Sequence, residues 1–444
     1  MKVLNETAIR LYSITYKFLF QCHRYNQLAH CEQYLAGLFH ECKSNIERMS
    51  ERVPNSDAQN LNHFISNAPW EALAVMAHTA GLVSERLGKL GKPVGLIFDE
   101  SGWEKNGVHS VGVGHQYIGN VGKRCNSQNG VFAALTSDSY VGLIGGRLYL
   151  PDAWTSDEKR CLKAGIPKAS IVYKTKPELA IEIHESVGGK VKYDWVGGDS
   201  IYGNSPTLRH YLAGAGETFV LDVGEGLGVY LNDPQPAVPP RTSKRGATPT
   251  QFTTTEKKVL LKDLIHQISA DQWRVIGHRN GTKGSLLRKA ALIDVYVWDT
   301  AYQDKVERLQ LIISTDKDGS EVKFSVCYQK NGKMTREDAL FRQMQRYFVE
   351  RGFQNAKEQL GMHQYQTRSW TAWHHHIALS LMALDFLLAQ QLDLNSEYPL
   401  ISCTDVKILI ARSLSNNFNT YENLITAMKK RHKQRQYDIT YNKT

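Results

Sequence analysis

The sequence predicts an α/β protein: a mixed β-sheet flanked by helices, joined to an all-helical N-terminal region and a β-rich insertion. Three observations predict this. Apolar residues recur at helical spacing to about residue 88. The order of expected elements then becomes strand, strand, strand, helix, strand, helix, strand, and four further strand-like runs follow a polar linker. Strands that alternate with helices are typical of a sheet covered on its faces.

Residues 1–88 are expected to form a helical domain. The run YNQLAHCEQYLAGLFHECKSNIERMSERV spaces apolar residues as one face of a helix does. Asn55-Ser56-Asp57 resembles a helix start, and Ala68-Pro69-Trp70 a break before the next helix. Such a unit suits DNA binding, and equally it could serve only as a packing platform.

Residues 89–225 are expected to form the first part of the core. VGLIF predicts one strand, and GVFAALTS and GLIGGRLYL predict a hairpin around Asp138-Ser139. Helices are expected near 176–188 and 204–214, each followed by a further strand, in YDWVGGDS and ETFVLDV respectively. The result is a mixed sheet with helices on its faces.

The rest of the chain divides into three segments. Residues 226–333 combine a linker rich in Pro, Thr and Ser with a β-rich, antiparallel insertion. Residues 334–392 return to helix and complete the core, and residues 393–444 form a basic C-terminal region. In the last segment, Lys429, Lys430 and Arg431 belong to the run MKKRHKQRQ. A basic run this short is usually a solvated end, and phosphate contact is the alternative.

Length and charge restrict the class of protein. A chain of 444 residues is too long for one ordinary core, so two or three domains are expected. The formal net charge of +10 favours a polyanionic partner, above all nucleic acid, although a charge of this size could also serve solubility.

A reduced, cytoplasmic compartment is expected. The N-terminal stretch carries polar residues throughout and shows no signal-peptide cleavage site. The longest apolar run, 377–388, is too short to span a bilayer and contains Asp385. The seven scattered cysteines include no CxxC pair. A zinc cluster is a minor alternative because its spacing matches no common site; its members would be Cys22, His23, His30, Cys31, His40 and Cys42.

Two aspartates each close an expected strand. Asp99 ends VGLIFD, and Asp199 ends the fourth strand in GGDSIYG. Reacting groups gather where the strands of an open α/β sheet end. One such Asp is more often a helix cap or turn residue. Two at the ends of neighbouring strands are a better candidate for binding Mg²⁺, which prefers one or two carboxylates.

Glu350 is the third candidate. On a helix, Arg346, Glu350 and Lys357 fall on one stripe, where a carboxylate can hold a metal and the cations can hold phosphate oxygens. The alternative is an exposed helix with an Arg346–Glu350 ion pair. The specific motifs of P-loop NTPases, α/β-hydrolases and zincins are absent. Three adjacent histidines, 374–376, cannot easily share a metal, because consecutive residues on a helix point in different directions.

Four blocks of the chain resemble DDE-superfamily transposases of bacterial insertion sequences, whose RNase H-like core is interrupted by a β-rich insertion. They cover about half of the chain. The blocks are YLAGLFHECKSNIERMSERV with NLNHFISNAPW, IFDESGWEKNGVHSVGVGHQYIGNVGKRCNSQNGV with GGRLYLP, DWVGGDSIYGN, and ERGFQNAKEQLGMHQYQTRSWTAWHHHIALSLMAL.

The resemblance implies a catalytic and metal-binding triad of Asp99, Asp199 and Glu350, holding two Mg²⁺ ions, or Mn²⁺ in their place. It further implies phosphate contacts from Arg346 and Lys357, which match the family's Tyr-Arg-Glu-Lys pattern. The family's Tyr position is Gln343 here. Glu100, beside the first Asp, is commonly acidic in relatives and receives no catalytic part.

By this resemblance, the expected function is that of a DNA transposase. It would bind the terminal inverted repeats of its element, cut the ends and join them to target DNA, in the bacterial cytoplasm near the nucleoid. At least a homodimer is expected in the DNA complex, and no membrane partner. Two alternatives stay open: a non-catalytic, transposase-derived DNA-binding protein, and a metal-dependent phosphohydrolase acting on small molecules.

Overall fold

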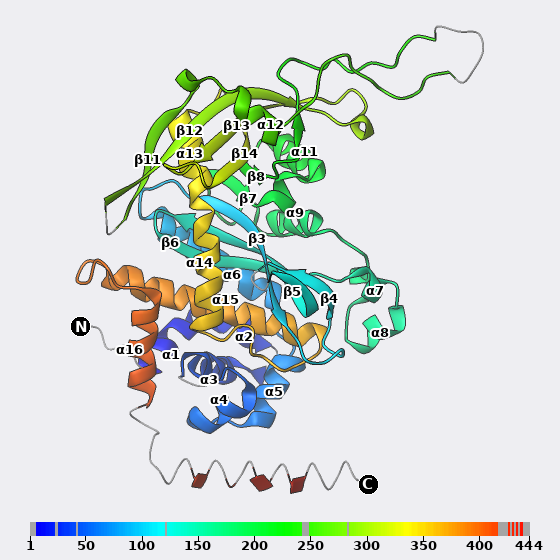
Figure 1. The fold of residues 1–444 in the computed structure, drawn as a ribbon. Coiled ribbons are helices and arrows are strands. Elements are labelled where there is room, and N and C mark those ends of the chain that lie inside the picture. The colour runs from blue at the N-terminus through cyan, green and yellow to red at the C-terminus, as the bar shows by residue number, and fades with distance from the viewer. Residues whose placement is uncertain are drawn as a thin grey trace.

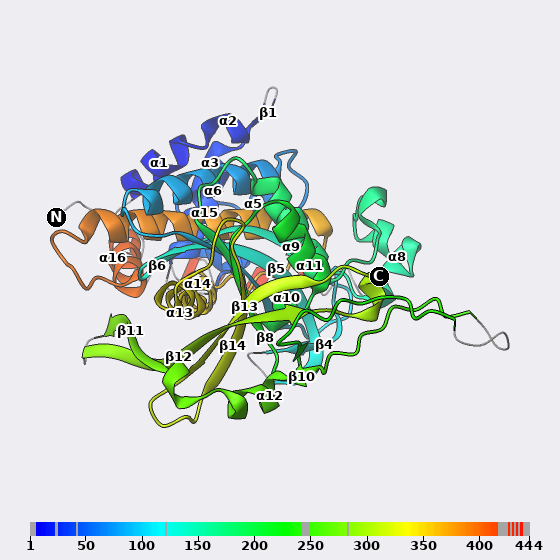
Figure 2. The ribbon, with the colours of Figure 1, turned by 90° about the horizontal axis from the view of Figure 1, so that it is seen from above.

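The computed structural model describes most of the chain. The described ranges are residues 6–22, 25–40, 43–119, 122–241, 248–281, 284–415, 425–426, 429, 432–433 and 436–437. Figures 1 and 2 show how a single large sheet divides helices into groups on either side.

Short helices make up the N-terminal region. They are α1 (Glu6–Ile14), α2 (Lys17–Phe20), α3 (Leu28–Phe39), α4 (Ile46–Arg52), α5 (Ala58–Ser66) and α6 (Ala72–Gly88), with the two-residue strands β1 (Gln21–Cys22) and β2 (Tyr25–Asn26) between α2 and α3. Asp57 begins α5 as expected, because its carboxylate accepts hydrogen bonds from the Gln59 and Asn60 amides. The sequence run with helical spacing is divided in the structure. Helix α3 ends at Phe39, and α4 begins at Ile46 with Asn45 as its N-cap.

Ten strands form the main sheet, in the order β11-β12-β13-β14-β8-β7-β3-β5-β4, with β6 also on β5. Their bounds are β3 (Gly95–Glu104), β4 (Gly114–Ile118), β5 (Lys123–Ser137), β6 (Tyr140–Leu148), β7 (Trp195–Gly198), β8 (Phe219–Val223), β11 (Arg274–Gly281), β12 (Gly284–Val297), β13 (Glu307–Thr315) and β14 (Val322–Tyr328). Within it, β6, β5 and β3 are antiparallel neighbours, and β3, β7 and β8 are parallel. This is the mixed sheet expected of an RNase H-like core.

The four long strands of the insertion extend this sheet and form no sheet of their own. Strand β14 pairs antiparallel with β8, from Phe324 opposite Val223 to Tyr328 opposite Phe219. The linker expected before these strands extends away from the sheet as two neighbouring segments (Figure 1). An antiparallel β-bridge between Ala237 and Thr253 joins the two segments. The short β9 (Gly228–Val229), β10 (Val259–Leu260) and α12 (Leu261–Leu264) lie at its base.

Helices cover both faces of the core sheet. The α-helices that follow α6 in the core are α7 (Asp152–Thr155), α8 (Glu158–Lys163), α9 (Lys176–Val187), α10 (Ser200–Gly203), α11 (Pro206–Gly214), α13 (Arg336–Gln345), α14 (Tyr347–Glu358), α15 (Trp370–Leu394) and α16 (Cys403–Ser415). Figure 2 shows α13 and α14 nearly end-on, beside the strands of the insertion.

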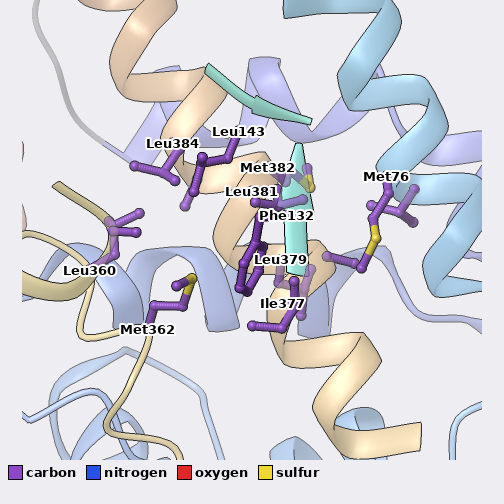
Figure 3. Packing of buried hydrophobic residues seen from close by; sticks show 14 of the residues in the cluster. Met76, Phe132, Leu143, Leu360, Met362, Ile377, Leu379, Leu381, Met382 and Leu384 are labelled. Atoms are coloured by element: carbon purple, nitrogen blue, oxygen red, sulfur yellow. The ribbon is translucent and has the colours of Figure 1, made fainter. Parts of the chain in front are cut away.

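Alternate residues of each strand face different helices, as the two-residue period of a strand requires. In β3, Leu96 and Phe98 join the buried cluster that includes residues of α9 and α11. Ile97 joins the cluster that includes α14 and α15. Figure 3 shows the centre of that second cluster, where Phe132 of β5 lies among side chains of α15 such as Ile377 and Leu381. Asp99 alternates with Ile97, so its side chain lies on the face covered by α14.

Helix α15 is the centre of the helical layer. It is long and apolar enough, by length and composition, to cross a membrane, yet 83% of its most apolar window is buried inside the protein. Within α15, Asp385 is fully buried. Its carboxylate accepts a hydrogen bond from the Tyr12 hydroxyl at 2.7 Å and forms an ion pair with Arg86 at 3.0 Å. This acid therefore ties α1 and α6 to α15.

We expect Asp385→Ala to lower the free energy of unfolding by about 3 kcal/mol, because it leaves the Arg86 cation without its buried partner. Chemical denaturation measures this, with Asp152→Ala, an exposed change in α7, as the control. Arg86→Ala in the Asp385→Ala background should add little; full additivity of the two changes would contradict the pairing.

Candidate active site

The two predicted aspartates lie at the same edge of neighbouring parallel strands. Pairing between β3 and β7 ends with Phe98 opposite Gly198, so Asp99 and Asp199 are the next residues on each strand. One carboxylate oxygen from each, with one from Glu100, lie within 4.8 Å of one another. This is the one group of three or more candidate metal-ligating side chains among the described residues.

The expectation that Asp99 closes its strand is wrong. Strand β3 continues to Glu104, because β5 is long enough to pair with it from Phe132, opposite Asp99, to Ser127, opposite Glu104. Only the pairing with β7 stops here, at Phe98, the residue before Asp99. The Asp99 backbone is therefore fixed by pairing with β5 on one side of β3. On the other side it lies beyond the pairing with β7.

Asp199 follows β7 and begins α10. Its Oδ1 accepts a hydrogen bond from the Ile201 amide (2.9 Å), so it is also a helix cap. The turn is tight: a Cβ on Gly203 would lie 1.9 Å from the Asp222 carbonyl oxygen, so only glycine lets α10 approach β8 this closely.

Burial and like charge raise the pKa of both aspartates. Burial first, and then the Asp199 carboxylate, raise the pKa of Asp99 to about 8. Burial and the Glu100 carboxylate raise the pKa of Asp199 to about 6. Such crowding of acids favours a bound cation, and carboxylate oxygens are the ligands that Mg²⁺ prefers. These residues therefore fit a divalent metal.

Arg346 links the acids on the sheet to Glu350. It lies at the junction of α13 and α14. Its guanidinium Nη1 is 3.7 Å from Asp99 Oδ2, and its Nη2 is 3.3 Å from Glu350 Oε1. Glu350 thus faces the same site as Asp99, one guanidinium group away, with its side chain 54% exposed. It is not a member of the close group of three oxygens.

Lys357 lies near Asp99, whose charge acts on its pKa, and Lys105 follows the end of β3. The Lys357 ammonium donates to the Gly102 carbonyl (3.1 Å), and burial lowers its pKa to about 8. Lys105 donates to the Tyr365 carbonyl (3.1 Å), and burial lowers its pKa to about 8 as well. The charges of both lysines lower the pKa of His363, after the larger effect of burial. These positive groups are suited to hold phosphate oxygens.

Two charged side chains that contact the site, Asp222 and Lys176, were not predicted as site residues from the sequence. Asp222 of β8 binds the Arg346 Nε at 2.7 Å, and Lys176 binds Glu100 at 2.8 Å. The single acid inside the apolar run FVLDV was the available signal for Asp222. Of the predicted basic tail, Lys429 is exposed, and Lys430 and Arg431 lie outside the described residues.

The three adjacent histidines of the sequence serve packing. His374, His375 and His376 are all buried, and their ring nitrogens lie at hydrogen-bond distance from the carbonyls of Trp370, Ile65, Trp70 and Met362. Of the minor zinc alternative, Cys31 is buried against Met382, while His23 and Cys42 and the side chain of Cys22 lie outside the described part of the chain.

Residues 17–285, more than half of the chain, match the family described as DDE superfamily endonuclease. The chain belongs to this superfamily. The resemblance to insertion-sequence transposases is confirmed with it.

The chain is similar to a curated relative and, more distantly, to a solved structure. The chain is 31% identical over 172 residues to a protein of Microchaete diplosiphon, "Probable transposase for insertion sequence element IS701", and the match covers 37% of this chain and 41% of that relative. The chain therefore spans less than half the length of that relative. The structure of a piggyBac transposase synaptic complex with hairpin DNA aligns with 96% of this chain and 78% of its own, at a TM-score of 0.36 and 12% identity.

We expect Asp99→Asn to stabilise the metal-free protein at pH 8. The unfolded carboxyl ionises near pH 4, whereas the folded one keeps its proton to about pH 8, so wild-type stability falls as pH rises through this window. The advantage of the variant should grow by about 1 kcal/mol per pH unit between pH 5 and 8. Thermal melting in EDTA measures it, and equal melting temperatures at pH 8 would contradict the raised pKa.

Proposed function

We propose that this protein is a transposase that binds the terminal inverted repeats of its own insertion sequence, cuts the ends and joins them to target DNA. The observation that carries the proposal is the juxtaposition of Asp99 and Asp199 directly after the last paired residues of the parallel strands β3 and β7, with Glu350 on the same face, in a member of an endonuclease superfamily.

Each side chain has a role that follows from its place. Asp99 and Asp199 would hold a divalent cation, and Glu350 would complete a second metal position across from them. When bound there, Mg²⁺, or Mn²⁺ in its place, activates the attacking hydroxyl and stabilises charge on the phosphodiester. Arg346 and Lys357 would neutralise phosphate oxygens beside the acids.

The β-rich insertion brings more positive charge to the site. The Arg279 guanidinium of β11 lies 5.2 Å from the centre of the exposed Tyr347 ring, three residues before Glu350. Near it, burial and then the charges of Arg279, Arg288 and Lys323 lower the pKa of His278 to about 4. A positive field at this edge suits a DNA backbone.

Further DNA contacts are assigned to the N-terminal helices and the basic tail that contains Lys429, Lys430 and Arg431. The apolar faces of α1, α3 and α5 are used in packing on α15, so their opposite faces are the ones available to DNA. Paired ends imply a homodimer at least in the DNA complex, within the bacterial cytoplasm and nucleoid.

Asp99→Asn should abolish Mg²⁺-dependent cleavage of a duplex carrying the element end, by at least 1,000-fold or about 4 kcal/mol in the barrier, because it removes a metal ligand at constant shape. End binding in gel shifts should change little. Asp138→Asn, an exposed turn residue between β5 and β6, is the matched control and should cut normally. Wild-type binding with no cleavage in Mg²⁺ or Mn²⁺ would favour a non-catalytic DNA-binding protein.

Lys357→Ala should reduce cleavage more mildly, by about tenfold, and make the salt dependence of end binding shallower by roughly one unit of log–log slope, as expected for loss of one phosphate contact. Binding titrations between 50 and 200 mM salt, roughly the range in which such slopes are resolved, measure this. Lys159→Ala, an exposed change in α8, should leave the slope unaltered. An unchanged slope for Lys357→Ala would remove this lysine from the DNA surface.

A further inference from the structure

A chain of buried polar side chains connects the insertion to Arg346. The Ser314 hydroxyl of β13 donates to Gln343 Oε1 of α13 at 2.6 Å, and Gln343 Nε2 donates to the Ser325 hydroxyl of β14 at 2.7 Å. Ser325 in turn donates to Asp222 Oδ1 at 2.6 Å. Both serines are fully buried and Gln343 is 3% exposed. Their polar atoms are shielded from water, so each relies on the hydrogen bond to the next side chain in this series.

The chain of contacts ends on the guanidinium group. Arg346 Nε donates to Asp222 Oδ2 at 2.7 Å, which is shorter than the contacts of its Nη atoms with Asp99 and Glu350. Asp222 therefore holds one side of the guanidinium, and the opposite side faces the candidate metal ligands. The strongest partner of Arg346 is thus an acid outside the expected triad.

This anchor has a consequence for the site. A partly buried guanidinium keeps its charge: although burial opposes the charge, the carboxylates of Asp222, Asp99 and Glu350 raise the pKa of Arg346. Without Asp222, the remaining acidic partners would be Asp99 and Glu350. The guanidinium would then close on these carboxylates and compete with a divalent cation for them.

Gln343 makes the anchor possible. Its amide presents an acceptor to Ser314 and, from a different atom, a donor to Ser325. Gln343 therefore joins Ser314 to Ser325, which in turn donates to Asp222.

We propose that Asp222, fixed by Ser325 and Gln343, is a positioning residue that anchors Arg346 and so limits how closely its guanidinium approaches Asp99 and Glu350, the side chains proposed to take a divalent cation. This proposal rests on the proposed function for the identity of the cation site. The position of the Arg346 side chain, however, can be tested without any cleavage.

The first test compares crystal structures of the metal-free wild type and Asp222→Asn, which keeps the shape and removes the charge. We expect the guanidinium in the variant to move away from residue 222 and towards Asp99 and Glu350, so that its contacts with these two acids become shorter than the 3.7 and 3.3 Å of the wild type. A guanidinium that stays in place would overturn the proposal. If Asp222→Asn does not fold, Gln343→Leu is used instead. This change removes the hydrogen bonds of Gln343 with Ser314 and Ser325 and keeps the Asp222 charge. The guanidinium in this variant should shift in the same direction.

The second test measures cleavage of an end duplex against Mg²⁺ concentration. Asp222→Asn should raise the Mg²⁺ concentration for half-maximal cleavage about tenfold, with the rate recovering at saturation. In an Arg346→Ala background the same change should have no further effect. A purely structural role would instead lower the rate at every Mg²⁺ concentration and add to Arg346→Ala, which would overturn the proposal.

Asp294→Asn is the matched control, because it removes the acid of a surface ion pair with Lys333 in the same insertion. It should leave the Mg²⁺ dependence unchanged, and a tenfold rise in this variant would overturn the assignment to Asp222. A wild type that cuts no DNA would contradict the proposed function, and the two crystal structures would then still decide the role of Asp222.

Discussion

The site depends on one guanidinium group that offsets the charge of acids from different parts of the chain. Asp99 and Asp222 come from strands of the sheet and Glu350 from a helix, and Arg346 contacts all three. Carboxylates placed this close, and largely removed from water, would otherwise repel one another or take up protons. Because Arg346 lies at the junction of α13 and α14, it also fixes where these helices stand over the sheet.

The fold supplies the positions of these groups through two simple regularities. Parallel pairing brings residues in the same register to the same edge, which places Asp99 next to Asp199. The alternation of side chains along β3 then selects the face, because Asp99 lies on the side of Ile97 and thus under α14. The helical layer built on α15 holds that face in place, and Asp385 fastens the N-terminal helices to it.

Much of this could be predicted from the sequence, and the failures have physical causes. Apolar runs that end on an acid pointed to Asp99 and Asp199, and helical spacing pointed to Arg346 with Glu350. The length of β3 was wrong because its continuation depends on a distant partner, β5, and not on local composition. Asp222 was missed because one acid in a short strand looks like any polar residue of a sheet; its pairing with a residue 124 positions away is set by tertiary packing.

The pairing of β14 with β8 has one more consequence. Because the insertion and the core share a sheet, the two cannot swing apart about a linker without breaking the backbone hydrogen bonds between these strands. If the insertion contacts a DNA duplex as proposed, its adjustment to the duplex must come from a change in sheet twist or from bending where α13 meets α14. In either case the movement would displace Arg346, which lies between α13 and α14. Binding of nucleic acid by the insertion would then alter the positions of the acids that Arg346 contacts.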